Sequence, residues 1–260
     1  MEENTQSAGF IPEPPEEFTT TDAMVGVFTE PGETYESVSR NPGKNYWILP
    51  VIIFVVLNLI STFVTFSDPE ILGNVMDERM ETARKQIEEQ VKSGELSREK
   101  GDEAIAAQEQ FMDPSSPFFI IIGYTFAALG PFVVLFLLSL LYFVGLKVFK
   151  SEAGYSAVLN VVGLALLISG IQAILTSVIS ILMGKLTVLS LGMFTSADQL
   201  GHGLFSFINS IDVFSIWLYI VISIGLIKVG KISAGQAYGM VFGIWILWTA
   251  ITSLMGGAFA

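Results

Sequence analysis

The chain has 260 residues, of which 52% are hydrophobic and only 15% are charged. Because about a quarter of the residues in a typical soluble domain are charged, this balance predicts a protein whose main solvent is lipid. The net charge of −12 argues against nucleic acid and against tight docking on anionic lipid headgroups, which both require clustered Lys and Arg. The absence of cysteine excludes disulfides, thiol nucleophiles and thiolate-bound metals.

The first 45 residues precede the first apolar segment. Residues 1–24 are rich in Pro, Glu, Thr and Ser, so they are predicted to form a disordered acidic tail. Residues 25–45 are predicted to form one short helix, since Pro31 suits a first helical turn and Asn41-Pro42-Gly43 ends it. Two interpretations stay open for this segment, an interfacial helix lying on the membrane and a polar linker.

Five apolar segments follow, and all but the fourth are clearly long enough to cross a hydrocarbon layer of about 30 Å. They predict an all-α integral membrane protein, a bundle of five transmembrane helices. Gly130-Pro131, in the middle of the second segment, predicts a kink. The fourth segment is short and has the least defined start. The predicted spans of this membrane domain, residues 46–260, are about 47–66, 118–148, 155–183, 210–229 and 236–259.

A polar insert, residues 67–116, separates the first two spans and is predicted to form a helical hairpin outside the membrane. Ser67-Asp68-Pro69-Glu70 is typical of a capping box with proline in the first turn, Gly94 ends the first helix, and Asp113-Pro114 ends the second. Its many charges favour an ordinary solvated surface. A cation-binding or protein-binding surface is the alternative, although no spacing matches a calcium loop.

Basic residues near the span ends indicate the orientation in the membrane. Only Lys185 lies near a span end on the side of the hairpin, whereas the opposite side has six basic residues. By the positive-inside rule, the N-terminus is predicted to be cytoplasmic and the C-terminus extracytoplasmic. The six residues are Arg40, Lys44, Lys147, Lys150, Lys228 and Lys231.

The sequence offers little for catalysis. No ionisable residue lies at mid-depth of a predicted span, which argues against an ion-coupled pump, and Asp212 at a span end is explained by capping. The only histidine, His202, lies near Asp198 in a Gly-rich connection, and a solvated loop pair is favoured over a metal or acid–base site. We therefore predict no enzyme, catalytic residue, metal or cofactor. Residues 186–207 are apolar but interrupted, which is typical of a re-entrant or interfacial segment.

Small and polar residues in the spans predict contacts between helices. Three glycines four residues apart at the start of the fifth span form two overlapping GxxxG steps, which favour packing within the bundle, with a dimerisation seam as the alternative. Three amides in the first and third spans are expected to form hydrogen bonds between helices, with a polar lipid-binding groove as the alternative. These residues are Gly235, Gly239 and Gly243, and Asn58, Asn160 and Gln172.

Two short motifs resemble those of the Ypt-interacting-protein (Yip) domain family of five-span membrane proteins. Val27–Tyr35 (VFTEPGETY) resembles the family's pre-membrane box, in which a proline and an aromatic residue precede the bundle. Asp212–Trp217 (DVFSIW), followed by Ile224-Gly225-Leu226, is similar to its second recurring feature. The resemblance extends over about residues 25–258, nearly the whole chain.

The resemblance implies a non-catalytic protein that acts as an organiser or adaptor of membrane proteins or of membrane trafficking. Candidate interaction residues are then Phe28, Pro31, Tyr35, Asp212 and Trp217. The short tail and acidic hairpin look more like prokaryotic members, which implies a plasma membrane, with lipid, other membrane proteins or a second copy as partners. The endoplasmic reticulum or Golgi and a small GTPase are implied only for a eukaryotic chain. The alternative function is transport or scrambling of a lipid or small solute.

Overall fold

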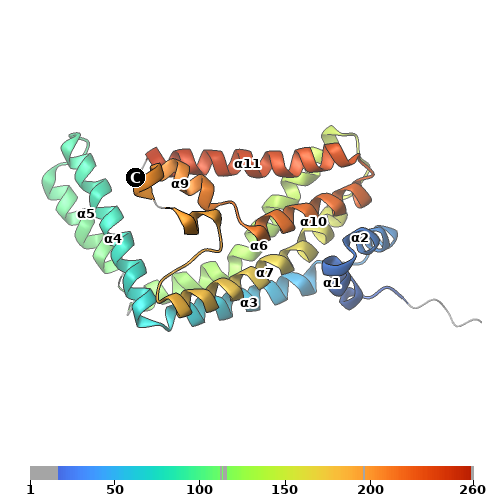
Figure 1. Ribbon diagram of the computed structural model, residues 1–260, viewed down its shortest axis with the longest axis horizontal. Helices are drawn as coiled ribbons and strands as arrows, with labels where there is room; N and C mark the ends of the chain where they lie inside the picture. The colour runs from blue at the N-terminus through green and yellow to red at the C-terminus, as the bar shows by residue number, and fades with distance from the viewer. Residues whose placement is uncertain (1–16, 112, 114–115, 196, 259–260) are drawn as a thin grey trace, which may run out of the picture.

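The computed structural model describes residues 17–258 apart from 112, 114–115 and 196. This part of the chain is helical and contains no strand. Five of its helices are long and apolar enough to cross a membrane, which confirms the predicted five-helix bundle. Figure 1 shows these helices running roughly alongside one another. They are α3 (Ile48–Phe66), α6 (Pro117–Val148), α7 (Tyr155–Met183), α10 (Val213–Gly230) and α11 (Ala234–Ala258).

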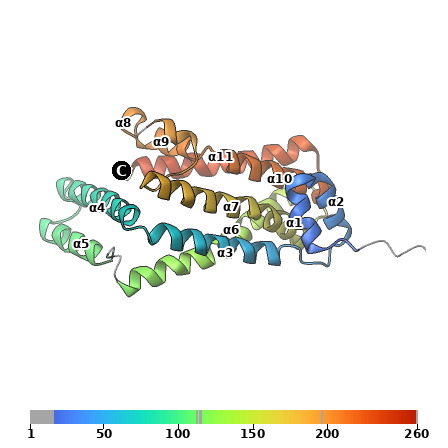
Figure 2. The same cartoon turned by 60° about the horizontal axis from the view of Figure 1, so that its bottom comes forward.

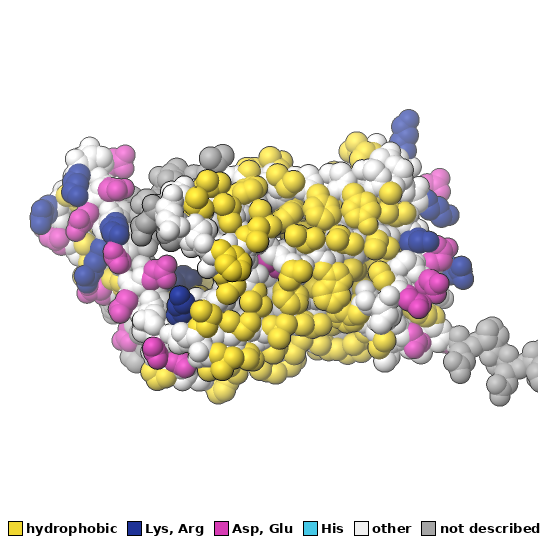
Figure 3. Space-filling model, in the orientation of Figure 1, with side chains coloured by type: hydrophobic (Ala, Val, Ile, Leu, Met, Phe, Trp, Pro, Cys, Tyr) yellow, Lys and Arg dark blue, Asp and Glu magenta, His cyan; other side chains and the backbone are white. Residues whose placement is uncertain are grey.

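The surface of the bundle is divided into zones along its long axis. Figure 3 shows a broad band of hydrophobic side chains with charged side chains gathered at both ends. This distribution fits a protein that spans a bilayer, because charged groups are costly within hydrocarbon. The end near α1 and α2 is called the platform end below, and the opposite end is called the hairpin end.

Helix α7 forms the centre of the bundle, and two-thirds of the residues in its most apolar 18-residue stretch are buried. Its small residues allow α3 to approach closely. A Cβ atom added at Gly163 would lie 2.9 Å from the Cα atom of Trp47, and one at Gly170 would lie 2.9 Å from Leu57. Ser177 shares a hydrogen bond with Ser61 of α3. Glycine and serine at seven-residue spacing therefore form the contact between these two spans.

Two helices precede the first span, where the sequence predicted a tail to residue 24 and then one helix. Helix α1 (Thr20–Thr29) begins inside the predicted tail because Thr19 and Asp22 form a reciprocal capping box. Helix α2 (Pro31–Arg40) begins at Pro31, directly after the cap residue Glu30. Figure 2 shows the pair at one end of the bundle. Residues 1–16 of the predicted tail lie outside the described residues.

The polar insert contains α4 (Pro69–Lys92) and α5 (Arg98–Phe111), which lie side by side in Figures 1 and 2. The cap of α4 is Asp68, whose carboxylate accepts hydrogen bonds from the backbone N–H groups of Glu70 and Ile71. The Ser67 hydroxyl instead donates to the carbonyl of Phe63, so the predicted capping box is replaced by an aspartate cap. An Arg84–Glu109 ion pair joins the two helices.

Three short helices connect α7 to α10. They are the 3₁₀-helix η1 (Leu191–Phe194), α8 (Ala197–Leu200) and α9 (His202–Asn209). The predicted fourth span began at residue 210, but α9 ends separately at Asn209 and α10 begins at Val213, because the Asp212 side chain caps it. Figure 1 shows α9 beside the C-terminal part of α11.

Candidate functional site

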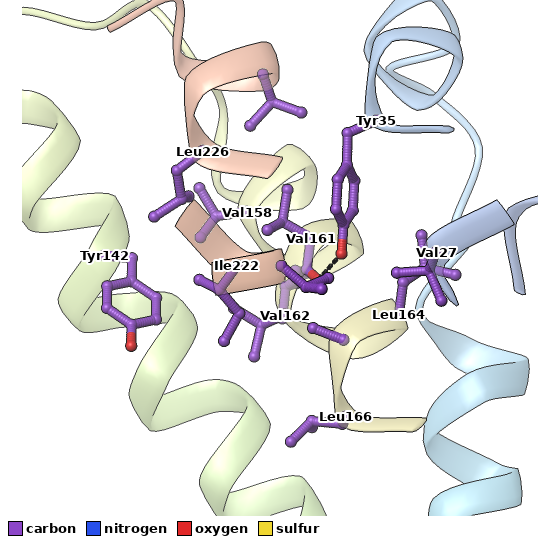
Figure 4. Close-up of a cluster of buried hydrophobic side chains, with 14 of the residues drawn as sticks. Val27, Tyr35, Tyr142, Val158, Val161, Val162, Leu164, Leu166, Ile222 and Leu226 are labelled. Carbon is purple, nitrogen blue, oxygen red and sulfur yellow. Dashed lines mark hydrogen bonds between the residues drawn. The ribbon is translucent and has the colours of Figure 1, made fainter. Parts of the chain in front are cut away.

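Helices α1 and α2 form a surface that is fixed to one end of the bundle, and we call this pair the platform. Tyr35 of α2 is fully buried, and its hydroxyl donates a hydrogen bond of 3.0 Å to the backbone carbonyl of Val161 in α7. Figure 4 shows this tyrosine pointing into the hydrophobic cluster, with Ile222 and Leu226 of α10 nearby. Burial raises the pKa of Tyr35, so the hydroxyl stays protonated and acts as a donor.

The two motifs noted in the sequence contact each other in the structure. The rings of Phe28 and Trp217 are 5.7 Å apart between centroids. Gly225 of α10 lies so close to α2 and α7 that an added Cβ atom would be 3.0 Å from the Tyr35 ring and 2.5 Å from Val161. The pre-membrane box therefore packs on α10, and its tyrosine belongs to the core and is unavailable as a surface contact.

An ion pair that the sequence analysis missed also joins the platform to the bundle. The Lys228 ammonium of α10 donates a hydrogen bond of 3.2 Å to the Glu36 carboxylate of α2. This interaction lowers the pKa of Glu36, and Arg40, which lies 3.7 Å from the same carboxylate, adds a smaller effect. Glu36 and Lys228 are 192 positions apart, so no local pattern in the sequence could have indicated the contact.

Asn160 fixes the chain between the platform and the first span. Its amide nitrogen donates to the Lys44 carbonyl at 2.9 Å, and its amide oxygen accepts from the Trp47 backbone N–H at 3.2 Å. The side chain is buried, and its two hydrogen bonds connect α7 to the entry of α3. Lys44 in turn donates to the carbonyl of Phe18, which precedes α1.

Gln172 is the second predicted amide with an interhelical partner. Its side-chain N–H donates to the Asp212 carboxylate at 3.0 Å. Asp212 is buried and also accepts from the backbone N–H groups of Phe214 and Ser215 and from the Ser215 hydroxyl. This carboxylate is therefore held by four donors at the start of α10, and its role is to cap that helix and join it to α7.

The three predicted amides do not form a common polar groove. Asn160 is sealed against the α3 entry, Gln172 bonds Asp212, and the half-buried Asn58 makes no hydrogen bond within the described part of the chain. Asn160 and Gln172 are twelve residues apart on α7, about 18 Å along the helix. This arrangement counts against a lipid or solute pathway lined by these amides.

The glycines of α11 face open space. A Cβ atom added at Gly235, Gly239 or Gly243 would meet no described atom within 4 Å. The favoured expectation was that these glycines pack within the bundle, but in the single chain they contact no other described helix. The open face is a place where a helix from another molecule could approach closely.

The exposed residues of the platform, which we call its outward face, include apolar, polar and charged side chains. Val25 is 60% exposed, and Thr29, Glu30, Glu33 and Arg40 are also exposed. Pro31 and Phe28 are half-buried beside them. Of the predicted interaction residues, Tyr35 and Asp212 thus serve inside the fold, while Pro31 and Phe28 border the accessible surface.

No group of three or more metal-ligating side chains occurs within the residues whose side chains the structure describes. The side chains of Asp198 and His202 lie outside that set, although their backbones belong to α8 and α9. The predicted loop pair formed by these two residues therefore remains a prediction.

These features define a five-span helical membrane protein with a helical platform packed onto its third and fourth spans. The Yip1 domain model matches residues 25–255, so the chain belongs to the Yip1 family. No curated protein and no solved structure matches it. It is an integral membrane protein, in contact with lipid, from a family that is linked to membrane trafficking and is generally non-enzymatic.

Proposed function

We propose that this protein is a non-catalytic adaptor that binds other membrane proteins or a second copy through the outward face of its platform. The observation that carries the proposal is the attachment of the platform: Tyr35 is bonded to Val161, and Glu36 is paired with Lys228. A surface fixed to a bundle in this way is preorganised, so binding costs little ordering entropy.

The platform is proposed to face the cytoplasm of a prokaryotic cell. Support comes from the basic residues at this end, including Arg40, Lys44, Lys147 and Lys228, which favour the cytoplasmic side under the positive-inside rule. The hairpin and the C-terminus would then be extracytoplasmic. A small GTPase of the Rab class is a partner only in a eukaryotic setting.

The open glycine face of α11 is proposed as a second contact, within the bilayer. Gly239 stands at its centre, flanked four residues away on each side by Gly235 and Gly243. A helix packed there would come from another subunit or another membrane protein, because no described helix of this chain occupies the face.

Site-specific photocrosslinking tests the platform directly. A photoreactive residue at Val25 should give a cross-linked species of defined mass in cells, and Glu33→Lys in the same chain should abolish it without changing the thermal stability. The matched control is a photoreactive residue at Thr82, which is exposed on the hairpin at the opposite end. Equal cross-linking at Val25 and Thr82, or no effect of Glu33→Lys, would overturn the proposed site.

A further inference from the structure

The segment between α7 and α10 returns from the hairpin end toward the interior of the bundle. Gln172, which bonds Asp212, lies eleven residues before the end of α7 at Met183, and this is about 16 Å along the helix. In the other direction, Asp212 lies sixteen residues, about 24 Å, before Lys228. These two distances give the helical bundle a length of about 40 Å along its axis. A hydrocarbon layer is about 30 Å thick, so the start of α10 lies within its depth.

The chain reaches the depth of Gln172 within a few residues of the end of α7. Gly184 ends α7 with a positive φ of 63°, and the Thr187 backbone N–H bonds the buried Ser180 hydroxyl at 3.0 Å. Leu191, only seven residues after Gly184, donates its N–H to the carbonyl of Ile211 at 3.0 Å. Because Ile211 adjoins Asp212, Leu191 lies at the level of Gln172, and η1 begins at that depth.

Several backbone N–H groups at this depth are hydrogen-bonded within the protein. The Gly192 N–H bonds the Ser190 hydroxyl at 3.2 Å, and the Met193 and Thr195 N–H groups bond the carbonyls of Ser190 and Gly192. The Ser190 hydroxyl in turn donates to the Asn209 side chain of α9. Irregular backbone at membrane depth is tolerated where the protein buries it, and Ser190 and Gly192 are both buried here.

The outward side chains of η1 and of the end of α7 are apolar. Phe194 is 85% exposed, which is the largest exposed fraction among the exposed large hydrophobics, and Leu182 at the end of α7 is 79% exposed. Leu191 and Leu204 are each about half exposed, whereas Leu186 lines a pocket with Glu78 and Arg79 of the hairpin. Leu191 bonds Ile211, two residues before Val213 of α10, which is 69% exposed, so this surface continues the exposed apolar surface of the spans.

We infer that the chain re-enters the bilayer from the hairpin end after α7, and that η1 packs its outward apolar side chains against lipid acyl chains. The occupant of this surface is lipid, because the surface is continuous with the spans and η1 begins at the depth of Gln172. The segment then also separates the buried Asp212 carboxylate from the water at the hairpin end.

Single-cysteine labelling tests this inference in the full chain, which has no native cysteine to remove. The variant Phe194→Cys is reconstituted in phosphatidylcholine vesicles and labelled with bimane. The control for lipid exposure is Phe126→Cys, at a 73% exposed position in α6, and the control for water exposure is Thr82→Cys in the hairpin. Circular dichroism and thermal unfolding check that the three variants are folded alike.

The expected result is a loss of bimane fluorescence at position 194 when acyl-brominated lipids replace ordinary ones, comparable to the loss at position 126 and absent at position 82. Labelling of Phe194→Cys by a charged maleimide should also be lost in intact vesicles and restored in denaturing detergent. Fluorescence at 194 that is insensitive to brominated lipid, with maleimide labelling as fast as at 82, would overturn the inference.

Discussion

The Tyr35 hydroxyl and the Val161 carbonyl, 126 positions apart in the chain, form a hydrogen bond of 3.0 Å between the platform and the central helix. Because Tyr35 is fully buried, this bond is shielded from water and fixes α2 on α7. The platform is thereby a structural part of the membrane domain, and its outward face is presented in a defined orientation.

Replacing Tyr35 tests this attachment. Tyr35→Phe removes one buried hydrogen bond and is expected to cost about 0.5–1.5 kcal/mol of unfolding free energy. Tyr35→Ala also leaves a cavity and is expected to cost about 3–5 kcal/mol. Unfolding in detergent measures both values, with the exposed Glu33→Gln on the same helix as the control. A Tyr35→Ala protein as stable as the control would show that the platform is not attached in this way.

Glycine substitutions separate the closed contact from the open one. Gly225→Ala pushes a methyl group toward Tyr35 and Val161 and is expected to lower stability by about 1–3 kcal/mol. Gly239→Ala places the same methyl group in open space, so stability should not fall. Thermal unfolding of the two variants under one condition checks the contrast. Destabilisation by Gly239→Ala alone would contradict the observed packing.

Asp212 is predicted to be a structural residue. Asp212→Ala removes the α10 cap and leaves the Gln172 amide without its acceptor, so it should cost about 1–3 kcal/mol. Asp212→Asn keeps an acceptor oxygen and should cost less than Asp212→Ala. Chemical unfolding of the two variants, together with Gln172→Ala, gives the ranking. If Asp212→Ala were as stable as wild type, Asp212 would not stabilise α10 as its cap.

The Glu36–Lys228 pair predicts a dependence of stability on pH. The pKa of Glu36 is lowered in the folded state, so folding favours the ionised carboxylate. Its stabilising contribution is fully present above the ordinary glutamate pKa near 4.5 and is lost as the pH falls through the lower folded value. The difference in unfolding free energy between wild type and Glu36→Gln should therefore become smaller on acidification. An unfolding series from neutral to acid pH measures it, and a constant difference would contradict the assignment.

Local signals in the sequence were sufficient for the spans and insufficient for their contacts. Long apolar runs predicted the five membrane helices, and Pro31 marked the start of α2. Helix α1 was missed because the Thr19–Asp22 capping box lies in a stretch whose composition resembles a disordered tail. Tertiary packing determines that Tyr35 is buried and that Gly239 is open, and a short motif does not encode either outcome.

The depth of Asp212 illustrates the same limit. Sequence placed it at a span end, and it does cap α10. It nevertheless lies well inside the bundle, because the preceding segment turns back along α7 before α10 begins. The interrupted apolar pattern of residues 186–207 indicated a re-entrant or interfacial segment, but hydropathy alone assigned the start of α10 to a membrane surface.

Native mass spectrometry of the protein extracted with its surrounding bilayer tests the adaptor account most directly, by comparing wild type with Val25→Glu. Position 25 is exposed on the platform, so the substitution should leave the fold intact. The account predicts that wild type retains a reproducible protein partner or second copy and that Val25→Glu loses it. A wild-type monomer that carries one specific class of lipid and no protein would contradict the account and favour lipid handling.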